Sequence, residues 1–157
     1  DSRIWPGMYA PLITMLKGER IVQPFRYLLR PRGQSAEFDR KYNGSYNMRR
    51  DRLQEVMWWK SIYGRNHGAM EIKAFFENVP LSKTRKLKKG EDDANLILRF
   101  DPQDGEPLLV PCMWDTNDAD EMTLYSFALI TDEPNPEVAA AGHDRTPVIM
   151  KFSNIDV

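Results

Sequence analysis

The stretch SFALITDEPNPEVAAAGHDRTPVIMKF, residues 126–152, contains the signals that decide the fold. It opens with a run rich in apolar and β-branched residues, which predicts a buried strand. Asn135 can cap a helix, and Pro136 suits the first helical position. Gly142 can adopt the left-handed conformation that ends such a helix. We therefore predict a strand, a helix that begins at Pro136 and stops before Gly142, and a second strand over 147–152.

The turn after this helix contains three polar residues in succession, His143, Asp144 and Arg145. A rigid scaffold commonly displays functional side chains at such a corner between two apolar strands. The alternative is structural: His143 hydrogen-bonds the corner together, and Asp144 forms a surface ion pair with Arg145. The residues alone leave both interpretations open.

Length and composition place the chain among ordinary globular proteins. With 157 residues it is expected to form one domain with a substantial core. Its longest apolar run, 107–114, is much shorter than the roughly 18 residues of a membrane span. The sequence does not open with a secretory leader. The single cysteine, Cys112, excludes an intrachain disulfide and fits a reducing cytoplasm, and its apolar strand predicts an inert core thiol.

Charge is divided unevenly along the chain. Residues 1–90 contain 19 Lys and Arg against 8 Asp and Glu, whereas residues 91–157 contain 3 against 15. A basic half with interleaved aromatic residues is typical of proteins that bind a phosphate backbone. Alternatively, the two halves attract each other, or the charges are simply solvated.

Residues 80–95, which include KTRKLKKGEDD, are predicted to form a solvent-exposed loop.

Two segments of the basic half offer groups suited to a nucleic acid. In the predicted strand 25–30, Tyr27 could stack on a base while Arg26 meets a phosphate. Asn47 offers hydrogen-bond donors and an acceptor, and Arg49 offers a rigid five-donor fork, so the two suit a sugar-phosphate. In the structural alternative Tyr27 is a core ring, Arg26 a surface charge, Asn47 a turn cap and Arg49 the partner of an acid.

A helix is predicted over roughly 52–63.

The segment AMEIKAFFENV, residues 69–79, alternates as a strand does. Glu77 falls on the same face as Phe75 and Val79. A carboxyl flanked by apolar side chains has a raised pKa and can serve as a general acid or base. The alternative is a solvated glutamate.

These strands together predict an α+β fold. It consists of a mainly antiparallel, partly closed and barrel-like sheet system with a few short helices. The predicted strands are 12–16, 20–23, 25–30, 69–79, 96–100, 108–114, 123–131 and 147–152.

Four segments resemble motifs of one family, the SRAP family of SOS-response-associated peptidase-like, abasic-site-processing proteins. GHDRTPVIM resembles its H-x-R-M-P-V-I-L motif, with Thr146 in place of Met. FRYLLR resembles R-W-G-L-I-P, with Tyr27 in place of Trp. YNMRRD resembles N-A-R-x-E, with Met48 in place of Ala. AMEIKAFFENV resembles a strand ending in G-F-Y-E-W, with Ala74 for Gly and Asn78 for Trp.

The resemblance implies a function in the DNA-damage (SOS) response. In this family the amine and thiol of an N-terminal cysteine condense with the aldehyde of an abasic site in single-stranded DNA, forming a thiazolidine crosslink. Carried over by motif, Glu77 is the acid and base, His143 assists sugar ring opening and Asn47 orients the sugar. The implied DNA-binding residues are Arg26, Tyr27, Arg49, Arg65 and Arg145.

The sequence starts at Asp1 without this cysteine. We therefore expect residues 1–157 to form a single SRAP-like domain that lacks an N-terminal strand and a C-terminal helix. No cofactor or metal is expected, because His67 has no ligand partners at metal spacing. The expected partner is single-stranded DNA with abasic sites, met by a cytoplasmic, nucleoid-associated monomer without contact to a membrane. Two alternatives stay open: a thiol-type autopeptidase or hydrolase, and a DNA-binding module without chemistry.

Overall fold

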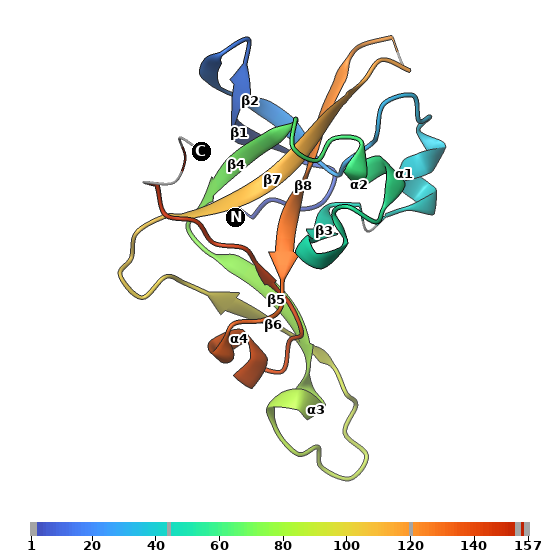
Figure 1. Cartoon of the computed structure of the whole chain (residues 1–157). Helices are drawn as coiled ribbons and strands as arrows, with labels where there is room; N and C mark the ends of the chain where they lie inside the picture. The colour runs from blue at the N-terminus through green and yellow to red at the C-terminus, as the bar shows by residue number, and fades with distance from the viewer. Residues whose placement is uncertain (1–2, 44, 120, 153–154, 156–157) are drawn as a thin grey trace.

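A sheet closed into a barrel forms the body of the protein (Figure 1). The computed structural model describes residues 3–43, 45–119, 121–152 and 155. In these residues one sheet has the strand order β2-β1-β4-β7-β8-β3, and β9 pairs with β8. Its strands are β1 (Tyr9–Leu16), β2 (Glu19–Tyr27), β3 (Asn47–Arg49), β4 (His67–Ile72), β7 (Leu108–Asn117), β8 (Leu124–Asp132) and β9 (Thr146–Pro147).

The barrel closes where the end of β2 meets β8. Arg26 pairs with Ser126 and Tyr27 with Phe127, both in parallel register. The α+β class and the partly closed barrel predicted from the sequence are thereby confirmed. The sheet is mixed, however, because β3 also runs parallel to β8 whereas the other pairings of the barrel are antiparallel.

Strand β8 is buried on both faces and joins two cores. Phe127 and Leu129 pack inside the barrel with residues of β1, β2, β4 and β7. Ala128 and Ile130 point to the other side, where they pack against Met48 of β3 and the segment around α2. Burying each large apolar side chain contributes about 2 kcal/mol. A strand covered on both faces reads as a continuous apolar run, which is why the sequence predicted it well.

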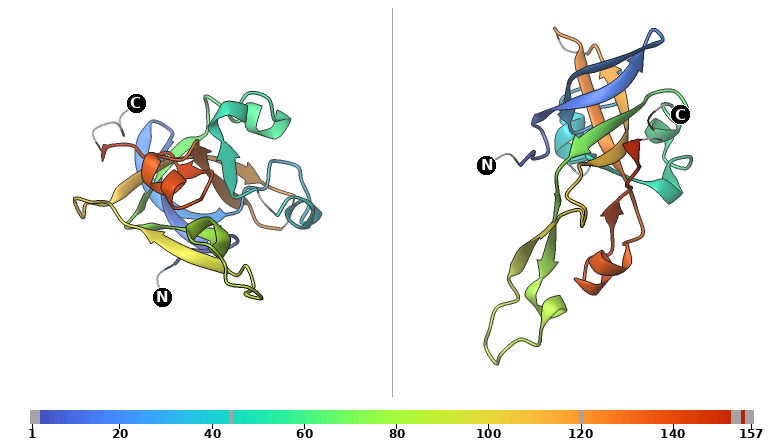
Figure 2. Two further views of the ribbon diagram at one scale, coloured as in Figure 1. Left: turned by 90° about the horizontal axis from the view of Figure 1, so that it is seen from below. Right: turned by 90° about the vertical axis from the view of Figure 1, so that its left-hand side faces the viewer.

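A two-stranded arm projects from the barrel. It is formed by β5 (Phe75–Pro80) and β6 (Asn95–Phe100), which pair antiparallel with each other, and by α3 (Leu81–Thr84) near its far end (Figures 1 and 2). The single strand predicted over 69–79 is therefore wrong in its continuity. The chain pairs with β7 as far as Ile72, breaks at residues 73–74 and continues with β6 as its new partner.

The helices are short. They are α1 (Glu37–Lys41), the 3-10 turn η1 (Arg50–Arg52), α2 (Met57–Lys60) and α4 (Pro136–Ala140). The helix predicted over 52–63 is wrong for most of its length, because Val56 has an extended backbone and the Asp51 carboxylate binds Arg49 instead of capping a helix. No helix among the described residues is long and apolar enough to cross a membrane.

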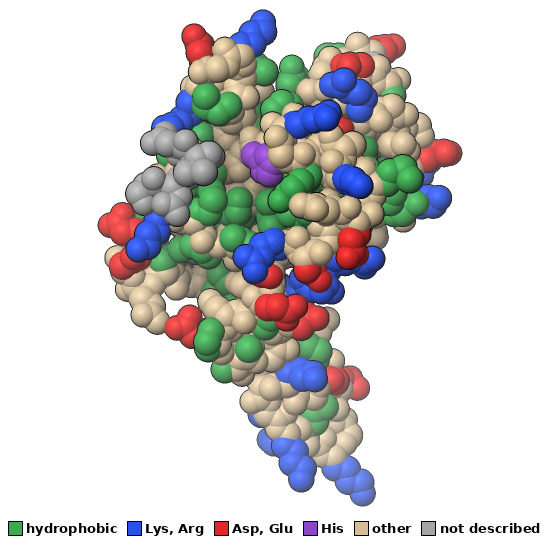
Figure 3. Space-filling view, viewed as in Figure 1, with side chains coloured by type: hydrophobic (Ala, Val, Ile, Leu, Met, Phe, Trp, Pro, Cys, Tyr) green, Lys and Arg blue, Asp and Glu red, His purple; other side chains and the backbone are tan. Residues whose placement is uncertain are grey.

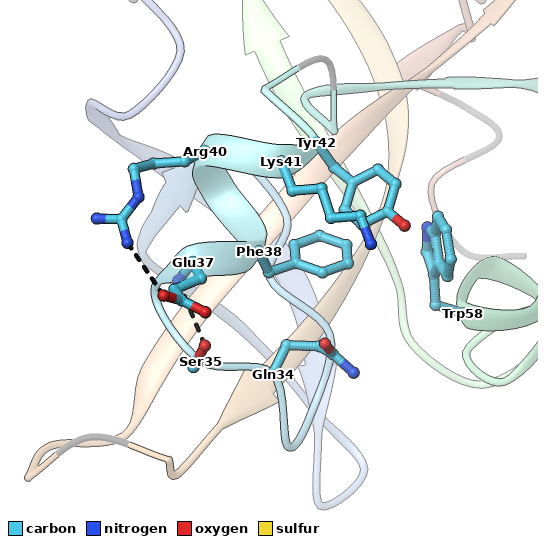
Figure 4. Close-up of a pocket in the computed structure, with 8 residues that line it drawn as sticks. All are labelled: Gln34, Ser35, Glu37, Phe38, Arg40, Lys41, Tyr42 and Trp58. Atoms are coloured by element: carbon cyan, nitrogen blue, oxygen red, sulfur yellow. Dashed lines mark hydrogen bonds and ion pairs between the residues drawn. The ribbon is translucent and has the colours of Figure 1, made fainter.

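Three aromatic rings join α1 to α2 (Figure 4). Phe38, Tyr42 and Trp58 contact one another with ring centroids 4.7–5.7 Å apart, beneath an open groove of about 580 Å³. Edge-to-face and tilted contacts of this kind stabilise aromatic clusters. The rings fix the two short helices to each other beside the barrel.

Candidate active site

The corner between α4 and β9, residues 142–145, has the helix end and turn that the sequence predicts, but the strand predicted over 147–152 is wrong, because only Thr146–Pro147 pair with β8 and beyond them Met150 makes an isolated bridge to Leu109. Asn135 Oδ1 accepts a hydrogen bond from the Val138 amide at 2.9 Å and so caps α4. Gly142 has a φ of +90°, a conformation that glycine adopts without strain. The chain then turns sharply and reaches β9, which pairs with the end of β8.

The corner packs directly against the arm. A Cβ atom placed on Gly142 lies 2.6 Å from Lys83 Cβ and 3.3 Å from Val79 Cγ1, so the backbone approaches closer than any side chain would allow. This contact brings the next residue, His143, to the face of β5 that bears Glu77. His143 Nε2 and Glu77 Oε2 are 3.1 Å apart, although 66 positions separate the two residues in the sequence.

The Glu77 carboxyl and the His143 imidazole are close enough to share a proton. His143 Nδ1 is 2.9 Å from the Arg145 carbonyl oxygen and 3.2 Å from the Arg145 amide nitrogen. If Nδ1 accepts from the amide, then Nε2–H donates to the Glu77 carboxylate. If Nδ1–H donates to the carbonyl, the proton facing Glu77 is either on the carboxyl or on a doubly protonated ring. Each arrangement lets the pair give up a proton and take one back.

Burial raises the pKa of Glu77 above its ordinary value. The charge of His143 acts in the opposite direction, and the nearby charge of Asp144 adds to the increase. The side chains of Glu77 and His143 are each only 22% exposed, so water screens their interaction incompletely. The sequence-based expectation of a carboxyl with a raised pKa at this position agrees with the environment of Glu77.

Asn47 is connected to this pair through Tyr27, which binds Asn47 and lies near enough to Glu77 for the charge of Glu77 to act on it. The Tyr27 hydroxyl donates to Asn47 Oδ1 at 3.2 Å, which leaves the Asn47 amide group to donate to a ligand. The Tyr27 ring stacks on Phe127 and meets Tyr46 edge-on. Burial, followed by the charges of Tyr46 and Glu77, raises the pKa of the Tyr27 phenol well above its ordinary value. The hydroxyl therefore stays protonated and remains a donor.

Two arginines lie close to the corner that bears His143: Arg145 is part of it, and the charge of Asp144 acts on Arg49. Arg49, at the end of β3, holds Asp51 through hydrogen bonds of 3.0 and 2.8 Å. The charge of Arg145 helps to lower the pKa of Asp51, after the larger effect of the Arg49 hydrogen bond. Arg145 Nη1 is buried and has no hydrogen-bond partner among the described residues. A buried, unsatisfied guanidinium nitrogen is costly, and an anion bound nearby would lower this cost.

Arg26 and Arg65 lie elsewhere. The Arg26 guanidinium binds Asp39 of α1 at 2.7 Å and the Leu28 carbonyl oxygen at 3.0 Å, so its contacts are internal. Arg65 is exposed before β4, whereas Glu77 follows β4, and it lines a separate groove of about 340 Å³ together with Thr14. Their DNA contacts stay predictions, and neither residue is brought to the Glu77–His143 pair.

Asp39 is a structural residue that the sequence did not single out. It binds both Arg26 and Arg30, and all three side chains are largely buried. We expect Asp39→Ala to lower the free energy of unfolding by about 3 kcal/mol, because it removes the carboxylate that two largely buried guanidinium groups bind. Asp101→Ala, which breaks the exposed pair with Arg99, is expected to cost less than about 1 kcal/mol. Urea denaturation at pH 7 measures the free energy of unfolding of both variants. Equal losses in the two variants would contradict the prediction.

The same cluster predicts a pH dependence. Burial raises the pKa of the Asp39 carboxyl, but hydrogen bonds from Arg30 and Arg26 outweigh it and hold the pKa below its ordinary value. A lowered folded-state pKa stabilises the protein above the unfolded-state pKa, near 3.8, and this stabilisation is lost as the pH falls further. The difference between the wild type and Asp39→Ala should therefore shrink between pH 5 and pH 3.

The sequence does not indicate the contacts of several residues around the site. Tyr46 contacts the Tyr27 ring, Asp51 holds Arg49, and Lys83 supports the corner. A signal existed only for Asp51, which lies two positions after Arg49 with the opposite charge. The other contacts depend on the closure of the barrel and on the direction of the arm, which local patterns do not encode.

Cys112 lies in the barrel core and is fully buried. Burial raises the pKa of its thiol well above the ordinary value, which suppresses the reactive thiolate. Within the described residues, no three His, Cys, Asp or Glu side chains come together as possible metal ligands. The Glu77–His143 pair is thus the chemically distinctive group of this part of the chain.

The fold and the site define an α+β barrel protein with a candidate acid–base centre between a projecting arm and a helix-to-strand corner. The family model described as SOS response associated peptidase (SRAP) matches residues 2–157, and the chain belongs to this family. Family membership connects the chain with the SOS response and with a DNA-related function in general. A search of curated proteins found no match.

Three crystal structures of similar fold come from two bacteria. A protein from Bordetella bronchiseptica is 21% identical with a TM-score of 0.74, and the match covers 97% of this chain and 72% of that one. A protein from Bacteroides thetaiotaomicron is 18% identical with a TM-score of 0.76, covering 96% and 62%. A phage-related protein from Bordetella bronchiseptica is 18% identical with a TM-score of 0.64, covering 94% and 63%. At this level of identity the similarity shows the fold alone.

Proposed function

We propose that this protein recognises abasic sites in single-stranded DNA and binds them covalently. The observation that carries the proposal is the pairing of Glu77 with His143 at 3.1 Å, in a partly buried setting that raises the pKa of the carboxyl. The aldehyde of an abasic site is normally masked as a cyclic hemiacetal. Opening it requires one group to remove the hydroxyl proton and another to protonate the ring oxygen, and a pair that shares one proton can supply both.

The open aldehyde then condenses with an amine and a neighbouring thiol. The amine nitrogen attacks the aldehyde carbon, and the carbonyl oxygen gains a proton. Protonation of the resulting hydroxyl expels water and leaves an iminium ion; the thiol sulfur adds to its carbon and the thiol proton is released, which gives a thiazolidine. The net change is loss of one water, with no oxidant or reductant. Glu77 in its acid form is the proton donor for the departing water, and His143 returns the proton to Glu77.

The residues around the pair suit the rest of the substrate. The free amide group of Asn47 can donate to a sugar hydroxyl. Arg145 and Arg49 can meet the flanking phosphates, with Arg49 exchanging part of its contact with Asp51. We keep Arg26 and Arg65 out of this set, since one is bound internally and the other lies beyond the far end of β4.

The amine and thiol are assigned to the N-terminal cysteine that the family resemblance implies. Cys112 does not supply them, because it is buried and has no free α-amine. The protein is expected to act as a monomer in the cytoplasm, at the nucleoid when bound to DNA.

The proposal is tested by incubating the full-length protein with a single-stranded oligonucleotide that contains one abasic site. Intact mass spectrometry should find protein plus oligonucleotide minus one water, and peptide mapping should place the link on an N-terminal cysteine. The same oligonucleotide without the abasic site should give no adduct. Absence of any adduct would refute the proposal, and shortening of the protein's own N-terminus instead would favour a peptidase.

A further inference from the structure

The end of the arm contains a dense group of cations. The arm tip, residues 81–93, comprises α3 and the loop that leads to β6. Its basic residues are Lys83, Arg85, Lys86, Lys88 and Lys89, and its acidic residues are Glu91, Asp92 and Asp93. In the space-filling view, blue side chains stand at the far end of the arm, away from the barrel (Figure 3).

Two of the acids in the arm tip are engaged in folding the loop. Glu91 forms an ion pair with Arg85 and accepts a hydrogen bond from the Lys88 amide at 2.8 Å. Asp93 accepts from the Ser82 amide at 2.8 Å and from the Ser82 hydroxyl at 2.6 Å. These bonds fix the shape of the loop and engage two of its three carboxylates, so that Asp92 is the remaining exposed acid beside the lysines.

Three lysines of the arm tip are not engaged in these interactions. Lys86, Lys88 and Lys89 are exposed, and among the described residues none of their ammonium groups has a hydrogen-bond or ion-pair partner. Three like charges within four positions repel one another, and this repulsion is relieved when an anion binds. The arm therefore presents a small, fixed patch of positive charge.

The arm connects this patch to the candidate active site along the chain. Glu77 lies on β5, which runs directly into α3, and Lys83 of α3 packs against Gly142 beside His143. The arm therefore starts near the Glu77–His143 pair, and its far end is the loop that bears the three lysines. A single-stranded DNA whose reacting sugar is bound at the Glu77–His143 pair can extend along the arm toward these lysines.

We propose that the arm tip binds the phosphate backbone of single-stranded DNA next to the reacting nucleotide, through Lys86, Lys88 and Lys89. This inference rests on the proposed function and extends it by assigning a second contact region. Lysine ammonium groups bind phosphates as flexible point charges, so the contact adds affinity without reading the base sequence.

The test measures how binding of an undamaged single-stranded oligonucleotide depends on salt. Each phosphate contact to single-stranded DNA contributes about 0.7 to the slope of log K against log [salt]. Lys86→Gln/Lys88→Gln/Lys89→Gln should therefore reduce the magnitude of this slope by about 2. Between 50 and 200 mM salt, the wild type should lose about 16-fold more affinity than the variant, the fourfold salt ratio raised to that slope difference.

Two control variants separate phosphate contact from other effects. Lys17→Gln/Lys60→Gln/Lys151→Gln removes the same charge from the barrel rather than the arm, and its slope should match the wild type. Replacing Lys86, Lys88 and Lys89 by Arg keeps the charge and should preserve the wild-type slope. Thermal denaturation checks that all three variants are folded.

Two results would overturn the inference. One is an unchanged slope in the arm variant while the wild type binds DNA and forms its adduct, which leaves the proposed function intact. The other is a reduction of equal size in the barrel variant, which reveals a general effect of net charge. A wild type that forms no adduct refutes the proposed function separately, whatever the slopes are. Selective binding of the arm to an acidic peptide, with no change in DNA binding, would point to a protein partner instead.

Discussion

Glu77→Gln should slow formation of the abasic-site adduct by about 10²- to 10⁴-fold, the usual contribution of a positioned proton donor. Glutamine has nearly the same shape and can still accept a hydrogen bond from His143 Nε2, so the corner keeps its geometry. What it lacks is the proton that the buried carboxyl supplies to the departing oxygen. Single-turnover rates with excess abasic-site oligonucleotide, followed by mass spectrometry, measure the difference.

The stability of Glu77→Gln provides its control. Because the folded-state pKa of Glu77 is raised, its contribution to stability is complete below the unfolded-state pKa, near 4.5, and is lost as the pH rises through the folded-state value. At pH 8 the partly buried carboxylate therefore lowers the stability of the folded protein, and replacing it by glutamine removes this destabilisation. We expect the variant to melt at or above the wild-type temperature at pH 8. Full reactivity in a well-folded variant would remove Glu77 from the mechanism.

The sequence predicted the corner well because its determinants are local. A capping asparagine, a proline at the first helical position and a glycine after the last turn act within a few residues of one another, and each has its predicted conformation. The strand before the helix was equally clear, since burial on both faces leaves an uninterrupted apolar run. The alternation of Phe75, Glu77 and Val79 was also correct, because those three residues lie within one strand.

What the sequence could not provide depends on partners far along the chain. Nothing between Ile72 and Phe75 shows that the strand leaves β7 for β6, because both halves have strand-like composition. The role of Arg26 was set by Asp39, an acid 13 positions away on a short helix. The approach of His143 to Glu77 follows from the contact of Gly142 with Lys83, which no periodicity indicates. The family resemblance named the pair, and only the fold shows how it is brought together.

Gly142→Ala should reduce the rate of adduct formation by about 100-fold, because it disturbs the contact between Gly142 and Lys83. The added methyl group lies 2.6 Å from Lys83 Cβ, a distance that neither backbone can accommodate without moving. A shift of α3 is transmitted along β5 to Glu77 and opens its 3.1 Å contact with His143. Displacing catalytic groups by about 1 Å costs about 10²-fold even when the mutated residue does not react.

Gly18→Ala is the matched control for this prediction. Gly18, in the β1–β2 turn, has a φ of +82°, close to the +90° of Gly142, but a Cβ atom there meets nothing within 4 Å. Both variants therefore bear the backbone strain of a left-handed alanine, about 1–2 kcal/mol, and only Gly142→Ala adds the collision with the arm. The stability of both should fall, whereas reactivity should fall only in Gly142→Ala. If the two variants react equally fast, the corner does not position His143 through Lys83, and the alignment of the pair must come from β9 and β8 alone.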